Sequence, residues 1–333
     1  SPLFPSTTLF RSVRPDWHEP SDLLGYISRI NGTRYITTDF FKFMMKALAA
    51  AVDSINNGKI IWKDMATVPP YWLCLDEMNL APVEQYFADY LAILETRKWE
   101  NGDFQSEPII KSATLQLLIH REGTDTDRPY DVLIEEVLSG SNLKLELKDY
   151  FLAKGIPLPP NLIVAGTVNM DETTHGFSRK VIDRALTLDF QEFFPNDYDV
   201  FFNPKVHPVV LGFPTVSEIN SPDELGNVLA DPDGAKSIAF LKEVNNTLKS
   251  TPFELAYRAL NELLLSIKCY APADEEHLFA VWDDFLMQKV LPRIEGDADK
   301  LGCNGGEESE ILAKLKNMIE RNFNKINTSQ GFM

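Results

Sequence analysis

The chain has 333 residues, and its 44% hydrophobic and 24% charged content is typical of a globular protein with one large domain or two ordinary ones. With 49 acidic against 32 basic residues, the net charge of −17 argues against binding nucleic acid over a broad surface, because the phosphates would be repelled. Three cysteines without paired spacing argue against a disulfide framework and a zinc site. No apolar run reaches the roughly 18 residues needed to cross a bilayer, so we expect a cytoplasmic protein.

Residues 1–12, SPLFPSTTLFRS, show no helical or strand periodicity. They resemble the translation of a ligated sequencing adapter, so we expect them to be non-native and leave them out of the predicted fold. An ordinary irregular N-terminal segment is the alternative. On the first interpretation, the gene is truncated upstream of Val13.

An α/β core is predicted over residues 13–194. A turn at Asn31-Gly32 indicates a hairpin within residues 26–37. Thr38 is suited to cap the helix that follows. The apolar stripe of that helix has helical spacing and comprises Phe41, Met44, Met45, Leu48, Val52 and Ile55.

A strand over residues 71–75 comes next, followed by a helix from near Pro82. Residues 99–160 are irregular, with β-like runs at 109–120, and we interpret them as an insertion. A strand at 162–168, a short helix at 178–184 and a strand at 185–190 complete the core. Strands that alternate with helices predict a largely parallel sheet covered on both faces.

The remaining residues predict a linker and a small helical domain. Residues 195–234 are rich in Pro, Asn, Asp and Gly, which is typical of a connection between domains. Residues 235–333 are expected to be helical. Helices are predicted at 238–248, from a capping box at Thr251–Glu254 to about 271, at 274–291 and at 310–323.

Two adjacent acids, Asp76 and Glu77, end the apolar strand Tyr-Trp-Leu-Cys-Leu. A buried strand that ends in Asp-Glu can place one carboxylate for Mg²⁺ and the next for activating a water, as the Walker B strand of an NTPase must do. Neighbouring strand residues point to opposite faces, so the two acids are not equivalent. The alternative is a helix N-terminus at which acids are favoured by the macrodipole.

Further polar residues follow the second strand. Asn169 ends it and is suited to orient an attacking water or contact a γ-phosphate, although Asn is also a common turn residue. Arg179 and Arg184 lie on the short helix before the next strand, and a guanidinium suits charge stabilisation from a neighbouring subunit. We favour Arg184 for that role. Arg258 is placed to reach nucleotide across a domain cleft, or else is a solvated helix residue.

The chain contains no phosphate-binding loop of the form G-x-x-x-x-G-K-[ST]. Gly58-Lys59 fails the pattern because Asp53 stands five residues before Gly58 and Ile60 follows Lys59. No G-x-S-x-G elbow, dinucleotide fingerprint or histidine spacing typical of metal ligands is present.

Taken together, these segments resemble the AAA+ NTPases, and within them the McrB-like branch of modification-dependent restriction systems. The resemblance implies a P-loop NTPase-type parallel sheet, here N-terminally truncated, followed by a helical lid. It implies that Asp76 is the Walker B Mg²⁺ ligand and Glu77 the carboxylate that activates the water, with Asn169 as sensor 1. Arg184 then matches the trans arginine finger, with Arg179 as a second nucleotide-binding arginine, and Arg258 matches sensor 2. The matching segments are VRPDWHEPSDLLGY, YWLCLDEMNLAPVEQYFADYLAILE, NLIVAGTVNMDETTHGFSRKVIDRA, FELAYRALNE and DDFLMQKVLPRIEG.

The implied function is a ring motor, expected to be a hexamer, that hydrolyses ATP with Mg²⁺ and drives a McrC-like nuclease on DNA held by other domains. GTP is the alternative nucleotide. Because the Walker A loop is absent, we expect this chain alone to bind and hydrolyse nucleotide poorly. Two other functions stay open, a MoxR-like or dynein-related protein remodeller and an inactive AAA+ scaffold. An adjacent nuclease gene favours the first function, and an upstream phosphate-binding loop excludes the scaffold.

Overall fold

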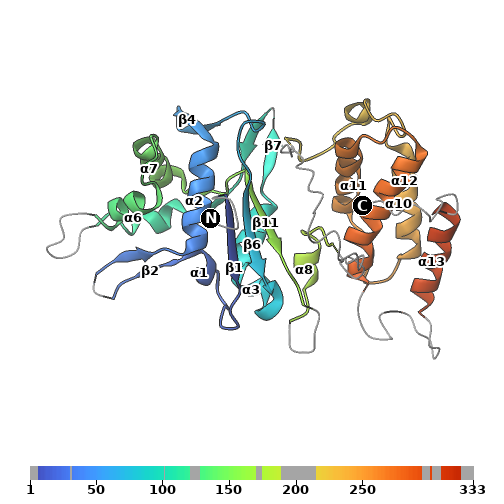
Figure 1. Ribbon diagram of the computed structural model, residues 1–333, viewed down its shortest axis with the longest axis horizontal. Helices are drawn as coiled ribbons and strands as arrows, with labels where there is room; N and C mark the ends of the chain where they lie inside the picture. The colour runs from blue at the N-terminus through green and yellow to red at the C-terminus, as the bar shows by residue number, and fades with distance from the viewer. Residues whose placement is uncertain are drawn as a thin grey trace, which may run out of the picture. The chain divides into compact units, whose positions relative to one another are not determined.

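The computed structural model describes residues 7–30, 32–100, 102–120, 128–169, 175–188, 215–294, 301 and 309–323. The chain divides into two compact units. The first comprises Ser1–Arg184 with Val209–Thr215, and the second comprises Ala185–Pro208 with Val216–Met333. The first unit holds the blue to yellow-green elements of Figure 1, and the second holds the orange and red helices.

A three-stranded parallel sheet lies at the centre of the first unit. It comprises β1 (Thr8–Ser12), β6 (Tyr71–Asp76) and β11 (Leu162–Gly166), with β6 in the middle. Leu73 and Leu75 of β6 are buried in the core of the unit. Because the three strands run parallel, their carboxyl ends lie at the same edge of the sheet. The predicted α/β class with a parallel sheet is confirmed.

Strand β1 corrects the expectation that residues 1–12 stand outside the fold. It pairs with β6 along its whole length, from Thr8 opposite Trp72 to Ser12 opposite Asp76. The backbone N–H of Val13 continues the ladder by donating to the carbonyl of Asp76 at 3.0 Å. Five residues are too few to show a clear alternation, so the neighbouring strand, rather than the local pattern, defines this one. Residues 1–6 lie outside the described residues.

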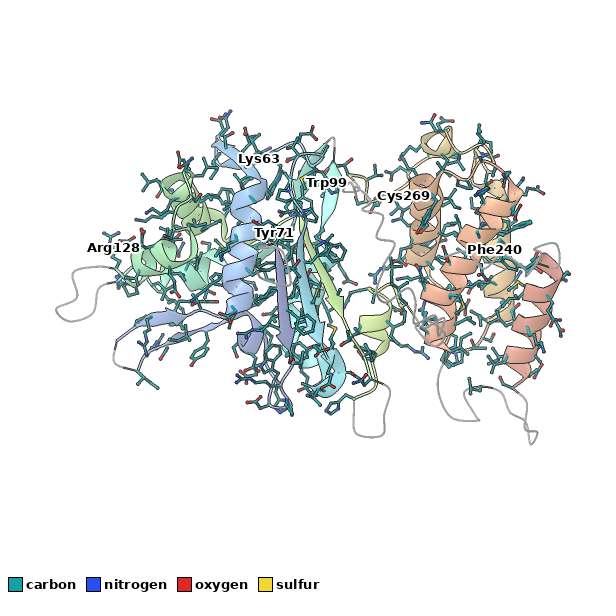
Figure 2. All side chains as sticks on the ribbon, viewed as in Figure 1. Lys63, Tyr71, Trp99, Arg128, Phe240 and Cys269 are labelled. Atoms are coloured by element: carbon teal, nitrogen blue, oxygen red, sulfur yellow. The ribbon has the colours of Figure 1, made fainter. Side chains whose placement is uncertain are left out.

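Helix α2 (Asp39–Ala51) lies alongside the sheet (Figure 1). It begins as predicted, with the Thr38 hydroxyl accepting from the N–H of Phe41 at 3.1 Å. Its face packs on the sheet through Phe43, whose ring lies 5.3 Å from that of Tyr71, labelled in Figure 2. The predicted stripe extended to Ile55, but the helix ends at Ala51, and the β-branched residues beyond it belong to a strand. The neighbouring elements are α1 (Pro20–Leu24), β4 (Val52–Asn56), β5 (Lys59–Trp62), α3 (Val83–Tyr86) and α4 (Ala88–Leu94).

The predicted hairpin around residues 26–37 is present as β2 (Tyr26–Ser28) and β3 (Arg34–Ile36). The 99–160 segment is more helical than expected, because the β-like interpretation of 109–120 holds only for its first two residues. Leu115 and Leu118 lie three residues apart and are both fully buried, which is a helical spacing. The elements here are β7 (Lys98–Glu100), β8 (Asp103–Gln105), β9 (Pro108–Ile110), α5 (Ser112–Gln116), α6 (Pro129–Val137), α7 (Lys144–Lys154) and β10 (Ile156–Pro157).

The predicted strand at 185–190 is not formed by its described residues, 185–188. They follow the short helix α8 (Arg179–Ile182) as irregular chain. There the carbonyl of Ala185 accepts from Lys289 Nζ at 2.8 Å, and the N–H of Thr187 donates to the carbonyl of Gln288 at 3.3 Å. These side-chain and backbone bonds replace a strand ladder. Residues 189–190 lie outside the described residues.

The second unit is a helical bundle, as predicted. Phe240 (labelled in Figure 2) stacks on Trp282 in its core, with ring centroids 4.5 Å apart. The capping box predicted at Thr251 is wrong, because its hydroxyl accepts from Phe253 N–H within a turn and the helix begins only at Tyr257. The elements are η2 (Pro222–Leu225), α10 (Ala235–Thr247), α11 (Tyr257–Tyr270), α12 (Glu275–Phe285), η3 (Leu286–Val290), η4 (Leu291–Arg293) and α13 (Glu310–Phe323).

Residues 215–234, the described part of the predicted linker, contribute the buried side chains of Leu225 and Val228 to this bundle. No helix among the described residues is long and apolar enough to cross a membrane.

Candidate functional site

The carboxyl ends of β6 and β11 continue side by side beyond the strands themselves. The N–H of Thr167 donates to the carbonyl of Leu75 at 2.9 Å, and the N–H of Met78 donates to the carbonyl of Thr167 at 2.8 Å. This extended ladder brings the segment that contains Asp76 and Glu77 next to the segment that ends in Asn169. The structure therefore places together the three residues that the sequence predicted at neighbouring strand ends.

The hydroxyl of Thr167 organises both acids. It donates to Asp76 Oδ1 at 2.8 Å and accepts from the backbone N–H of Glu77 at 2.9 Å. Asp76 is half-buried at the strand end, whereas Glu77 is exposed. The Asp76 carboxylate is thus held at the edge of the sheet, and the Glu77 carboxylate that follows it is accessible to solvent.

Glu77 adopts a left-handed backbone conformation, with φ 52° and ψ 51°. A residue with a Cβ pays about 1–2 kcal/mol for this conformation, and such strain is concentrated at functional sites. The turn directs the side chain toward β11, where Asn169 Nδ2 donates to Glu77 Oε1 at 3.0 Å. Two of the three predicted catalytic side chains, Glu77 and Asn169, are therefore in direct contact.

Asn79 lies beneath this contact on the short 3₁₀ turn η1 (Met78–Leu80), and only 1% of it is exposed. Its Nδ2 donates to the carbonyls of Asn169 at 2.8 Å and His175 at 3.2 Å. Its Oδ1 accepts from the N–H of Asn169 at 3.3 Å, and its own carbonyl accepts from the N–H of His175 at 3.0 Å. Asn79 therefore adds side-chain and backbone bonds to those by which Met78 and Thr167 already join the turn after Glu77 to the segment after β11.

Tyr86 supports the same turn from α3. Its hydroxyl donates to the carbonyl of Met78 at 2.9 Å. Burial raises the pKa of Tyr86 above its usual value, so the phenol stays protonated and keeps donating across the physiological range. The turn that holds Glu77 is thus bonded from both β11 and α3.

Of the predicted arginines, Arg184 pairs with a carboxylate outside this cluster. Arg184 is bound within its own unit, with Nε and Nη2 at 3.0 and 2.8 Å from Glu95 Oε1, and only 18% of its side chain is exposed. Arg179 is exposed on α8. Arg258 is exposed in the first turn of α11, in the second unit.

No group of three His, Cys, Asp or Glu side chains is placed to hold a metal ion within the described part of the chain. Asp76 supplies a single carboxylate, and Mg²⁺ is commonly bound through one or two carboxylates together with substrate phosphates and waters. Among the described residues, Asp76 alone supplies a carboxylate suited to a Mg²⁺ ion shared with another ligand, and no all-protein metal site is formed there.

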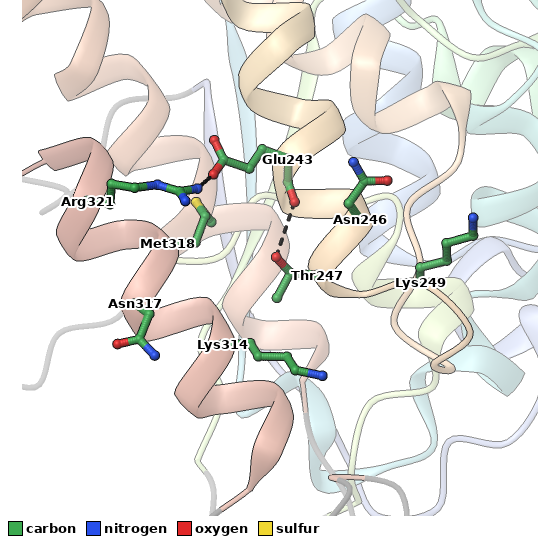
Figure 3. A pocket seen from close by; sticks show the side chains of 8 residues that line it. All are labelled: Glu243, Asn246, Thr247, Lys249, Lys314, Asn317, Met318 and Arg321. Carbon is green, nitrogen blue, oxygen red and sulfur yellow. Dashed lines mark hydrogen bonds and ion pairs between the residues drawn. The ribbon is translucent and has the colours of Figure 1, made fainter.

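A separate hollow of about 510 Å³ lies between α10 and α13 of the bundle (Figure 3). Two of its charged side chains, Arg321 and Glu243, form an ion pair, and Lys314 pairs with Glu310 outside the lining. It contains none of the predicted site residues. Its lining comprises Glu243, Asn246, Thr247, Lys249, Lys314, Asn317, Met318 and Arg321.

Sequence reasoning missed Thr167 and Asn79, although both stand in the stretches that it singled out. One usable signal was Gly166 inside the second strand, because a strand glycine often marks a close approach. A Cβ at Gly166 would lie 2.6 Å from Met78 Sδ, so the glycine lets the two strand ends meet. Asn79 carried no comparable signal, since its partners are about 90 residues away in sequence.

Comparison with protein-family models finds a match in the second unit. A family model described as a domain of unknown function (DUF8727) matches residues 224–331, which lie in the second unit. No curated protein matches the chain.

Proposed function

We propose that the first unit carries the Walker B and sensor 1 portion of an AAA+-type nucleotide hydrolase, with ATP as the substrate and GTP as the alternative. The observation that carries this proposal is the 3.0 Å contact between Asn169 Nδ2 and Glu77 Oε1, on adjoining parallel strands and next to Asp76. A carboxylate that is exposed, strained and aimed by an amide is suited to act on a bound ligand.

In this function Glu77 accepts a hydrogen bond from the attacking water and draws off its proton as the new O–P bond forms. The terminal phosphoryl group leaves the bridging oxygen, and the products are the diphosphate and inorganic phosphate. Asn169 holds the Glu77 carboxylate in place for this step. Asp76 would hold Mg²⁺, whose charge offsets that of the phosphates.

The remaining roles are assigned by resemblance. The bundle serves as the lid, with Arg258 at the sensor 2 position, and the complete protein assembles into a ring with a McrC-like nuclease as its partner. An arginine finger acting on a neighbouring subunit is supplied from the α8 region. Arg184 would have to leave Glu95 for that role, whereas Arg179 is already exposed.

The test compares Glu77→Gln with the parent in the protein expressed from its complete reading frame, with ATP and GTP assayed separately. Turnover should fall by about 10²–10⁴-fold, the usual contribution of a general base, while nucleotide binding is kept. Glu84→Gln is the control, because Glu84 is an exposed acid on α3 outside the site. Equal hydrolysis by Glu77→Gln and the parent would remove Glu77 from this role.

A further inference from the structure

We propose that Asn79 is a positioning residue for hydrolysis, which sets where the Asn169 amide meets Glu77. This inference rests on the proposed function and extends it to a residue without direct access to substrate. Asn79 is buried, so it acts only through the groups that it bonds.

The clamp that Asn79 forms is complete. A side-chain amide offers two N–H donors and a carbonyl acceptor. Here the Nδ2 group donates to the carbonyls of Asn169 and His175, and Oδ1 accepts from the N–H of Asn169. A single side chain thus holds the peptide N–H and the carbonyl of Asn169 at once, which resembles the pairing of a neighbouring strand.

This pairing determines the geometry of the catalytic contact. Because the backbone of Asn169 is held on both sides, its side chain leaves the chain from a defined point and reaches Glu77 Oε1 at 3.0 Å. Asn79 also lies two residues after Glu77, on the turn that begins at its left-handed backbone. The positions of Glu77 and Asn169 therefore both depend on the same short turn. A shift of Asn79 would move the two side chains relative to each other.

Asn161 offers a matched comparison at the opposite end of β11. It is also fully buried, and its Nδ2 donates to two backbone carbonyls, those of Ala47 at 3.1 Å and Pro69 at 3.2 Å. These bonds join β11 to α2 and to the chain before β6, and they touch none of the acids. Loss of Asn161 should therefore cost stability without a specific effect on the site.

The experiment measures kcat, KM and the thermal midpoint for Asn79→Ala, Asn79→Asp and Asn161→Ala in the full-length protein. Asn79→Asp retains the acceptor and loses both donated bonds. Both Asn79 variants should lower kcat by about 10–100-fold, because small misplacements of reacting groups are costly, while KM changes by less than about threefold. Asn161→Ala should lower the thermal midpoint by about as much as Asn79→Ala does. It should leave kcat of the folded protein unchanged.

Two kinetic results would overturn the inference. One is an Asn79→Ala enzyme with the kcat of the parent, and the other is an equal fall of kcat in Asn161→Ala, which would indicate a general structural effect. If the parent hydrolyses no nucleotide, or Glu77→Gln matches it, the proposed function itself fails. The side-chain amide resonances of Asn169 provide a readout without activity. They should shift in Asn79→Ala and stay in place in Asn161→Ala, and unchanged resonances in Asn79→Ala would contradict the clamp.

Discussion

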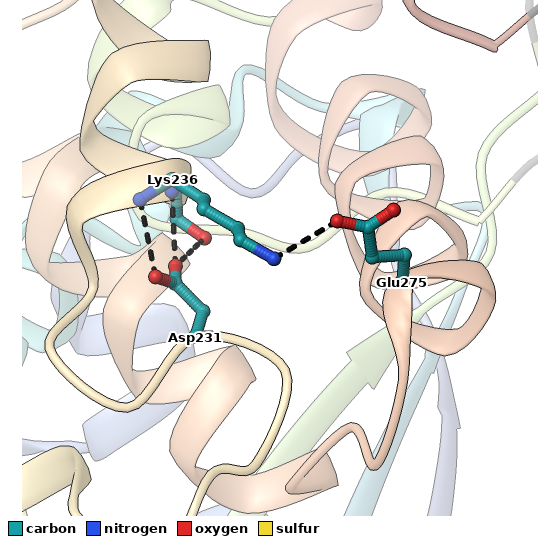
Figure 4. A network of polar contacts seen from close by, with 4 residues as sticks. Asp231, Lys236 and Glu275 are labelled. Atoms are coloured by element: carbon teal, nitrogen blue, oxygen red, sulfur yellow. Dashed lines mark hydrogen bonds and ion pairs between the residues drawn. The ribbon is translucent and has the colours of Figure 1, made fainter.

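Both units contain an acidic side chain held by several hydrogen bonds, but the two differ in access to solvent. In the bundle, Asp231 is 1% exposed and accepts from the N–H groups of Lys236 and Ser237 and from the Ser237 hydroxyl, at 3.1, 2.9 and 2.6 Å (Figure 4). Trp282 Nε1 then donates to the same hydroxyl at 2.9 Å. All of these hydrogen bonds hold the start of α10 against α12.

At the strand ends of the first unit the bonding has a different result. Thr167 and Asn169 each occupy an oxygen of an acid, yet Glu77 remains exposed. The Asn169 amide bonds the Glu77 carboxylate, and the buried side chain of Asn79 in turn holds the backbone of Asn169. A hydrogen-bond network whose side chains are all buried, like that of Asp231, stabilises the fold. A network with a buried supporting residue and an exposed carboxylate, like that of Asn79 and Glu77, can present the carboxylate to a ligand.

The largest effect on stability is expected for Asp231→Ala. It removes the carboxylate that accepts from the Lys236 and Ser237 N–H groups in the first turn of α10, of which the Ser237 group is buried, and this should cost about 2–4 kcal/mol of unfolding free energy. Urea unfolding followed by helical circular dichroism measures this loss. Asp233→Ala is the control, because Asp233 is exposed and accepts only from the N–H of Ala235. Equal losses in the two variants would show that burial of the Asp231 network is not what matters.

A smaller effect is expected for Arg184→Ala, which tests whether this arginine belongs to the structure or to the chemistry. Loss of its pair with Glu95 should cost about 1 kcal/mol, the upper end for a partly exposed ion pair. Arg179→Ala, at an exposed position on α8, is the comparison for turnover. If turnover falls only in Arg179→Ala, the finger is Arg179, and if it falls only in Arg184→Ala in assembled rings, Arg184 has left Glu95 to act.

The smallest and opposite effect is expected for Glu77→Gly. Glycine accepts the left-handed backbone without the Cβ penalty, so unfolding free energy should be unchanged or rise by up to about 1 kcal/mol. Turnover should be abolished at the same time. A clear loss of stability in thermal unfolding would show that the Glu77 side chain supports the fold rather than being strained for function.

The amino-acid sequence by itself determined the elements whose signals are local. Thr38 caps α2, and α13 spans the predicted residues 310–323, because capping chemistry and helical spacing are read within a few turns. It also predicted that Glu77 and Asn169 lie at one edge of the sheet. Two apolar strands that each end in a polar residue must bring those ends to one edge when they run parallel.

Only the tertiary structure decided the features that depend on distant partners. Strand β1 exists because β6 lies beside it, and α11 begins late because Phe253 is drawn into the bundle core. The pairing of Arg184 with Glu95 and the clamp of Asn79 on Asn169 each join residues about 90 positions apart. Local periodicity carries no information on such contacts, because their geometry is set by the packing of whole elements rather than by neighbouring residues.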